Sequence, residues 1–116
     1  MDGTGCIFCR IASGQMAADI VAEDDLVVAF RDLSAQAPTH ILLIPRQHLR
    51  SAAELTEEHG PMLGRLFATA ARLALDEGVA RDGFRVVTNS GPAAGQSVDH
   101  LHFHLLGGRS FSWPPG

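Results

Sequence analysis

The chain has 116 residues, 46% of them apolar, and a formal net charge of −4. That length is enough for one domain with one hydrophobic core, and the apolar content excludes a disordered chain. The nine cations are all Arg and form no basic run, which argues against a non-specific nucleic-acid binder, because such proteins neutralise many phosphates. No stretch reaches the ~20 apolar residues of a membrane-spanning helix. We therefore expect neither nucleic acid nor a membrane as a partner.

The N-terminal residues 1–5 show neither the basic region nor the apolar stretch of a secretory signal, so we expect a cytoplasmic protein. The two cysteines follow directly, in the segment Cys6-Ile7-Phe8-Cys9. Cysteines at this spacing form a redox pair, supply half of a metal site, or are ordinary thiols. A thioredoxin-like redox pair needs a preceding strand, and none is predicted here.

The first half of the chain predicts short elements separated by turn residues. In chain order these are a helix over 6–13 ended by Gly14, strands over 20–23 and 26–31 joined by a tight turn at Asp24-Asp25, a loop over 32–39, and a strand over 40–44 ended by Pro45. We expect the last strand to be buried, because it is a compact apolar run.

One long helix dominates the second half. Thr56 is expected to cap its N-terminus and Gly78 to end it. Apolar side chains at helical spacing predict one buried stripe, formed by Leu63, Leu66, Phe67, Ala70, Leu73 and Ala74. Strands are predicted over 84–89 and about 99–106, with a glycine-rich loop between them and an irregular tail after them.

The strands of this pattern do not alternate with helices. An α/β protein with a parallel sheet is therefore not expected. The sequence predicts an α+β fold, in which a mostly antiparallel, five-stranded sheet packs with one long and one short helix.

Three of the six histidines lie within five residues, at His100, His102 and His104. Side chains of a strand alternate between its two faces, so these imidazoles share one face and the intervening apolar residues share the other. Packing alone gives no reason for such a row. The row fits a solvated histidine-rich face, a metal centre, or nucleophilic catalysis by one imidazole whose neighbours fix its tautomer.

The loop over 91–97 precedes these histidines and contains two Gly, one Pro and one Ser. Small residues let the backbone approach an anion closely, as phosphate sites require. Asn89, at the end of the preceding strand, adds a further donor. The loop is either a flexible connector or a phosphate site, and its place beside three imidazoles favours the phosphate site.

The stretch over 100–106, with His alternating with apolar residues, resembles the histidine triad motif. More closely, the chain resembles the Hint branch of that superfamily, the histidine triad nucleotide-binding proteins. The segments that carry the resemblance are 37–45, His48, 89–97, the triad, Gly107-Gly108-Arg109 and Trp113-Pro114-Pro115-Gly116. It implies a single HIT-like domain over 1–116. It also implies a homodimer, with the tail 107–116 contributing to the dimer and to the active site.

The resemblance further implies a purine nucleoside phosphoramidase. His102 would attack the α-phosphorus and form a nucleotidyl-histidine, which water would hydrolyse to the nucleoside monophosphate. His104 would contact the phosphate or help protonate the leaving amine, and Ser97 would stabilise charge on the phosphoryl oxygens. The implied nucleotide-binding residues are Phe8, Ile11, Phe30, Asp32, Leu33, Asn89, Gly95, Gln96, Ser97, His102 and His104. Asp32 would bind the ribose hydroxyls.

Two other functions use the same histidines. One is a dinucleoside polyphosphate hydrolase, and the other is a nucleotide-binding regulatory module with low turnover. No cofactor is expected for catalysis.

Some histidine triad proteins carry a C-x-x-C pair that binds zinc together with two histidines. The matching positions here are Cys6, Cys9, His48 and His100, a closed set typical of structural zinc. Without zinc, His48 and His100 would support the catalytic site through hydrogen bonds. His40 also matches the family, but we assign it no chemical role.

Overall fold

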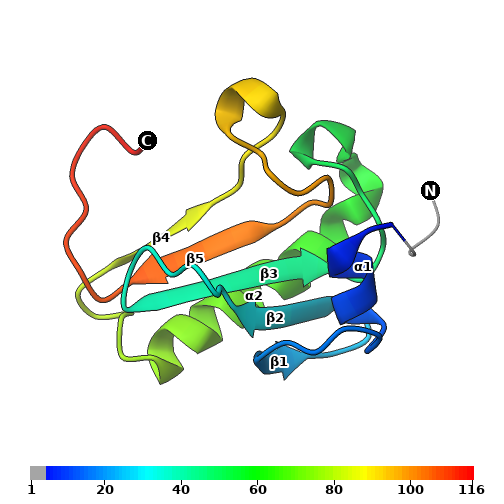
Figure 1. Cartoon of the computed structure of the whole chain (residues 1–116). Helices are drawn as coiled ribbons and strands as arrows, with labels where there is room; N and C mark the ends of the chain where they lie inside the picture. The colour runs from blue at the N-terminus through cyan, green and yellow to red at the C-terminus, as the bar shows by residue number, and fades with distance from the viewer. Residues whose placement is uncertain (1–4) are drawn as a thin grey trace.

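The computed structural model describes residues 5–116, so most of the segment that bears on a secretory signal lies outside it (Figure 1). The helices and strands, in chain order, are α1 (Ile7–Ala12), β1 (Ile20–Glu23), β2 (Val27–Arg31), β3 (Thr39–Pro45), α2 (Gly60–Asp76), β4 (Phe84–Val87) and β5 (Phe103–Gly107). Within the described residues, no helix combines the length and apolar character needed to cross a membrane.

The strands form one five-stranded sheet in the order β1-β2-β3-β5-β4, and every neighbouring pair is antiparallel. The predicted α+β fold is therefore confirmed. Strand β5 inserts between β3 and β4, and the long connection from β4 to β5 carries the glycine-rich loop and the first histidines of the row.

The two faces of the sheet are covered differently. In Figure 1, α2 runs across the back of the sheet and α1 lies at the front, near the ends of β2 and β3. Two apolar clusters result, with Ile41 and Leu43 in the one against α2, and Leu42 and Ile44 in the one against α1. Strand β3 is buried along its whole length because both of its faces are covered.

Strand β5 begins at Phe103, not near residue 99 as predicted. The N–H of Leu101 donates to the carbonyl of Leu49 at 2.6 Å, so this segment bonds to a loop and not to a neighbouring strand. The expected alternation nevertheless holds. Leu101 and Phe103 join the cluster against α2, whereas the imidazoles of His100 and His102 lie beside Phe8 of α1 on the other side.

The predicted long helix is divided at its start. Thr56 caps a single 3₁₀ turn over 57–59, and α2 begins at Gly60, because Pro61 lacks an N–H and fits only a first helical turn. Gly78, with φ of +77°, ends the helix as predicted. Phe67 was expected in the buried stripe but is 48% exposed, although its ring forms a T-shaped pair with that of Phe103, with centroids 5.6 Å apart.

Candidate functional site

A cavity of about 420 Å³ opens between α1, the loop after β2 and the histidine row. Eight residues implied by the resemblance line it: Phe8, Ile11, Phe30, Asp32, Leu33, Ser97, His102 and His104. Its inner part is apolar, and the rings of Phe8 and Phe30 meet edge to face with centroids 5.5 Å apart. The cavity therefore offers an apolar slot formed by Phe8, Ile11 and Phe30, together with carboxylate, hydroxyl and imidazole groups.

The His102 side chain is held in one orientation. Its Nδ1 lies 2.7 Å from the carbonyl oxygen of His100, and a carbonyl only accepts, so Nδ1 carries the proton. The lone pair of the neutral ring is therefore on Nε2. The hydroxyl of Thr88 donates to the carbonyl of His102 at 2.8 Å and fixes the backbone as well. An oriented ring with a free Nε2 lone pair, lining a cavity, has the geometry of a nucleophile.

A chain of hydrogen bonds sets the tautomer of His104. The N–H of Gln36 donates to Nδ1 of His40 at 3.0 Å, so the proton of the neutral His40 ring is on Nε2. That nitrogen lies 2.8 Å from Nδ1 of His104 and 3.3 Å from Oδ2 of Asp32. Nδ1 of His104 therefore accepts, and its Nε2 carries a proton that is free to donate into the cavity.

Burial keeps these imidazoles neutral. It lowers the pKa of His104 to about 4, with further lowering by the neighbouring His102 and His40 and partial opposition from Asp32. Burial also lowers the pKa of His40, against the attraction of Asp32. In the free chain at neutral pH, His104 is thus an uncharged hydrogen-bond donor.

Sequence reasoning gave His40 no role, yet its ring contacts both His104 and Asp32. A partial signal was present, since His40 shares its strand face with Leu42, which lines the cavity. The decisive information was the pairing of β3 with β5, which sets Leu42 opposite His104 and brings His40 diagonally next to it.

The glycine-rich loop is stabilised largely by its own residues. The side chain of Gln96 accepts from the N–H of Gly91 at 2.8 Å and donates to the carbonyls of Arg50 and Val98. The amide of Asn89 donates to the carbonyl of Ala94 at 2.9 Å. These side chains, which the resemblance places on the nucleotide, bond to the loop and to the segments beside it.

The backbone N–H groups of Gly95 and Gln96 likewise bond within the loop, to the carbonyls of Pro92 and Gly91. None of Asn89, Gly95 and Gln96 lines the cavity, whereas Ser97 and Val98 do. The loop therefore presents Ser97 and Val98 to the cavity.

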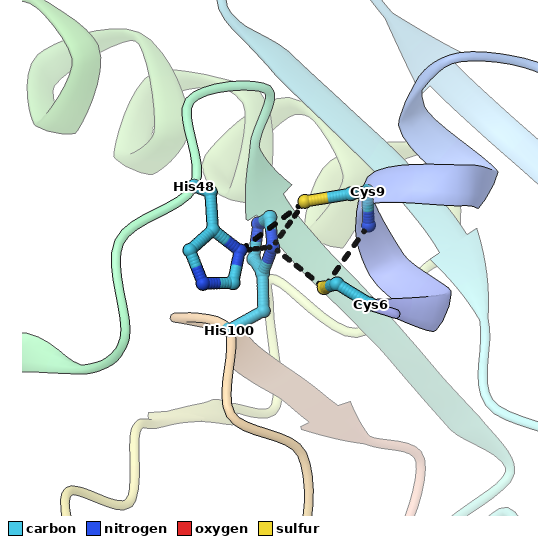
Figure 2. A group of neighbouring side chains, drawn as sticks. All are labelled: Cys6, Cys9, His48 and His100. Carbon is cyan, nitrogen blue, oxygen red and sulfur yellow. Dashed lines mark hydrogen bonds between the residues drawn. The ribbon is translucent and has the colours of Figure 1, made fainter. Parts of the chain in front are cut away.

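A second group of side chains lies behind the cavity. Figure 2 shows Cys6, the N-cap of α1, and Cys9 of α1 facing the imidazoles of His48 and His100. The Nδ1 atom of His100 is 3.3 Å from the sulfur of Cys6, 3.4 Å from that of Cys9, and 3.1 Å from Nδ1 of His48. The sulfur of Cys9 lies 3.2 Å from Nδ1 of His48. Folding thus gathers four ligand-type side chains from three separate segments, which we call the Cys₂His₂ cluster.

The donor atoms of this cluster fit a metal ion. Nε2 of His100 lies 2.9 Å from the carbonyl of Pro45 and must donate to it, so the lone pair of Nδ1 faces the cluster. All four ligand atoms lie within 4.8 Å of one another, and two sulfurs with two imidazole nitrogens form a closed tetrahedral set for zinc. Burial and the neighbouring Cys6 raise the pKa of the Cys9 thiol to about 11, so forming its thiolate is unfavourable. A bound cation would stabilise the thiolate and remove this cost.

The group of Asp32, His40 and His104 also brings three ligand-type atoms together. It does not fit a metal, because Nδ1 of His40 accepts from a backbone N–H and Nε2 is then protonated. A protonated nitrogen has no lone pair to offer. Hydrogen bonding accounts for this group.

A family model described as the HIT domain matches residues 13–111. The chain belongs to the HIT family. The HIT-like fold is confirmed by a HIT family hydrolase from Legionella pneumophila, whose solved structure matches with a TM-score of 0.93 at 43% identity. That match covers 96% of this chain and 99% of the other.

Three proteins similar to this chain have names that describe an activity or a bound metal. Adenylylsulfatase HINT1 of Arabidopsis thaliana is 50% identical, over 95% of this chain and 76% of its own length. Purine nucleoside phosphoramidase of Escherichia coli K12 is 48% identical, over 89% and 87%. The 14 kDa zinc-binding protein of Zea mays is 47% identical, over 100% and 91%.

Proposed function

We propose that this HIT protein hydrolyses the P–N bond of purine nucleoside 5′-phosphoramidates through a nucleotidyl-His102 intermediate and releases the nucleoside monophosphate. The observation that carries the proposal is the His102 ring, whose Nδ1 is bonded to the His100 carbonyl while Nε2 is free and the ring lines the cavity. The relative named purine nucleoside phosphoramidase supports it.

The cavity has a place for each part of the nucleotide. The purine enters the apolar slot between Phe8, Ile11 and Phe30, with the exposed Leu33 at its mouth. The ribose diol donates to the carboxylate of Asp32, which still has acceptor capacity after receiving the N–H of Ser34. The α-phosphate then lies between the histidines and the hydroxyl of Ser97.

The reaction takes two displacements at phosphorus. In the first, the Nε2 lone pair of His102 forms a bond to phosphorus, the P–N bond breaks, and its electron pair leaves with the amine. In the second, a water oxygen attacks phosphorus and the bond to Nε2 breaks, which restores neutral His102. The Nδ1–H bond to the His100 carbonyl stabilises the cationic adduct between these steps.

His104 assists the proton transfers. Its Nε2–H donates a hydrogen bond to the departing nitrogen, which takes a proton from a water molecule, and the hydroxide formed attacks phosphorus in the second step, so one water is consumed overall. His40 is the positioning residue that holds His104 through its Nδ1.

Charge on the phosphoryl oxygens is stabilised by Ser97, which lines the cavity. We assign Asn89, Gly95 and Gln96 a supporting role, because their hydrogen bonds keep the loop in shape. His100 supports catalysis through its backbone carbonyl, and no cofactor takes part in these steps.

A structural zinc ion in the Cys₂His₂ cluster is part of the proposal. When bound, it supplies a closed tetrahedral centre that neutralises the two thiolates and joins α1 to the segments of His48 and His100. The relative named 14 kDa zinc-binding protein supports this assignment.

We further propose that the single domain 1–116 forms a homodimer and works in the cytoplasm. The exposed Phe67 on α2, the open edge of β4 and the tail 107–116, where Trp113 is 85% exposed, offer apolar surface for a second copy. Closed two-fold symmetry is the commonest form of oligomer. Sedimentation of the wild-type chain beside Phe67→Glu tests it, and a monomeric wild type contradicts it.

A panel of substrates with one nucleoside and different leaving groups tests the activity. We expect fastest release of AMP from adenosine 5′-phosphoramidate, compared with adenylyl sulfate and a diadenosine polyphosphate. Adenylyl sulfate belongs in the panel because a relative is named adenylylsulfatase. An inert phosphoramidate would overturn the proposal.

His102→Ala tests the nucleophile within the same panel. We expect turnover to fall at least about a thousandfold, as the loss of a covalent nucleophile does elsewhere, while AMP still binds. Turnover that survives this substitution excludes His102 as the nucleophile, and turnover that is negligible in the wild type favours a binding module.

A further inference from the structure

Helix α1 and its N-cap residue contribute side chains both to the Cys₂His₂ cluster and to the cavity. The helix has six residues, and Cys6, its N-cap, and Cys9 provide both sulfurs of the Cys₂His₂ cluster. Phe8 lies between them in the sequence, with its ring centroid 6.0 Å from that of His100 and 5.2 Å from that of His102, and both Phe8 and Ile11 line the cavity. A movement of α1 therefore changes the cluster and the cavity together.

His100 makes a second link between them. Its imidazole is fully buried and faces both sulfurs, while its backbone carbonyl accepts the Nδ1 proton of His102 at 2.7 Å. The ring of His100 is also held by the carbonyl of Pro45. If His100 shifts when the Cys₂His₂ cluster changes, its carbonyl shifts too, and that carbonyl sets the tautomer of His102.

A helix of six residues is too short to be stable without tertiary contacts. Besides its apolar contacts, α1 is held at its end by Arg46, whose guanidinium donates to the carbonyl of Ala12. Its beginning is held through the sulfurs, which without a cation contribute only weak hydrogen bonds. The order of the first turn of α1 thus depends on what the cluster contains.

We propose that the Cys₂His₂ cluster positions the nucleotide site, so that a bound Zn²⁺ tightens nucleotide binding and a bound nucleotide tightens Zn²⁺ binding. The residues of the cluster act as positioning residues through Phe8 and through the carbonyl of His100. The inference rests on the proposed nucleotide site. Because coupling between two binding sites is reciprocal, the two ligands must raise each other's affinity by one common factor.

The test measures both sides of this coupling with Zn²⁺ and AMP. Calorimetry gives the dissociation constant of AMP for the zinc-loaded chain and for the chain stripped by a chelator. We expect about tenfold weaker binding to the stripped chain, within the usual range for coupled sites. Competition with a chromophoric chelator then gives the Zn²⁺ affinity with and without saturating AMP, and the same factor should appear. Neither measurement depends on catalysis.

Two histidine variants complete the test. His48→Gln removes a ligand that does not line the cavity, so AMP should bind weakly until enough Zn²⁺ is added to fill the weakened cluster. His59→Gln is the matched control, because Nδ1 of His59 bonds to the N–H and hydroxyl of Thr56 in a helix cap, and both affinities should stay at the wild-type values. Circular dichroism shows whether each stripped chain is folded, and if it is not, the Zn²⁺ titration of His48→Gln decides alone.

Equal AMP affinity, within twofold, for the loaded and stripped chains overturns the inference and leaves the proposed function intact. The same conclusion follows if His48→Gln binds AMP normally at every Zn²⁺ concentration. A chain that binds no AMP in either form overturns the inference and the proposed nucleotide site together.

Discussion

The neutral, partly buried state of His104 predicts a specific loss of stability in acid. The imidazole titrates at an ordinary pKa of 6.5 in the unfolded chain and at about 4 in the folded chain. Between these values the unfolded chain binds more protons, so stability is complete above about pH 6.5 and falls as the pH falls toward 4. His104→Asn removes this titration, and the Asn carbonyl still accepts from Nε2 of His40.

The size of the effect follows from the two pKa values. A pH of about 5 lies about 1.5 units below the pKa of the unfolded chain and still above that of the folded chain. Each such unit lowers the free energy of unfolding by about 1.4 kcal/mol. The wild-type chain should therefore lose about 2 kcal/mol more than His104→Asn when the pH falls from about 7 to about 5. Shared losses from other groups cancel in this difference.

Urea unfolding of the two proteins at both pH values measures this difference, with a chelator present throughout so that metal release does not contribute. The folded state of each variant at about pH 7 is checked by circular dichroism. If the wild type and His104→Asn lose stability equally, His104 is not held neutral in the folded chain. The assignment of its Nε2–H as a neutral donor would then be wrong.

Three further substitutions and one control test single contacts. Thr88→Val removes the hydroxyl that donates to the His102 carbonyl, so the free energy of unfolding should fall by about 1 kcal/mol. In steady-state kinetics, kcat should fall by a larger factor than KM rises. Unchanged kinetics would contradict this positioning role of Thr88. Phe8→Leu removes the ring that meets Phe30, so KM for the nucleotide should rise, while thermal unfolding should show a loss of less than about 1.5 kcal/mol in stability. An unchanged KM excludes Phe8 from the apolar slot. Gly107→Ala puts a Cβ 2.8 Å from the Val79 side chain and should lower the free energy of unfolding in urea by about 1–3 kcal/mol. A Cβ at Gly5 meets nothing within 4 Å, so the control Gly5→Ala should leave the stability unchanged. Equal losses of stability in the two variants would refute the close packing at Gly107.

Local patterns in the sequence determined much of the fold. The apolar run before Pro45, the turn at Asp24-Asp25 and the stop at Gly78 specify elements that the structure contains. These features act through neighbouring residues, so reading the chain in order is enough to find them. The boundaries of α2 and β5 were missed, because Pro61 and the bond from Leu101 to Leu49 decide them.

The sequence also predicted most side chains of the candidate site, since the alternating histidines and the Cys pair stand out against any packing pattern. Only the tertiary structure decided what each nitrogen does. The pairing of β3 with β5 brings His40 to His104, and the carbonyl of His100 sets the tautomer of His102. These contacts join residues or backbone groups whose positions depend on strand register, and register is a property of the assembled sheet.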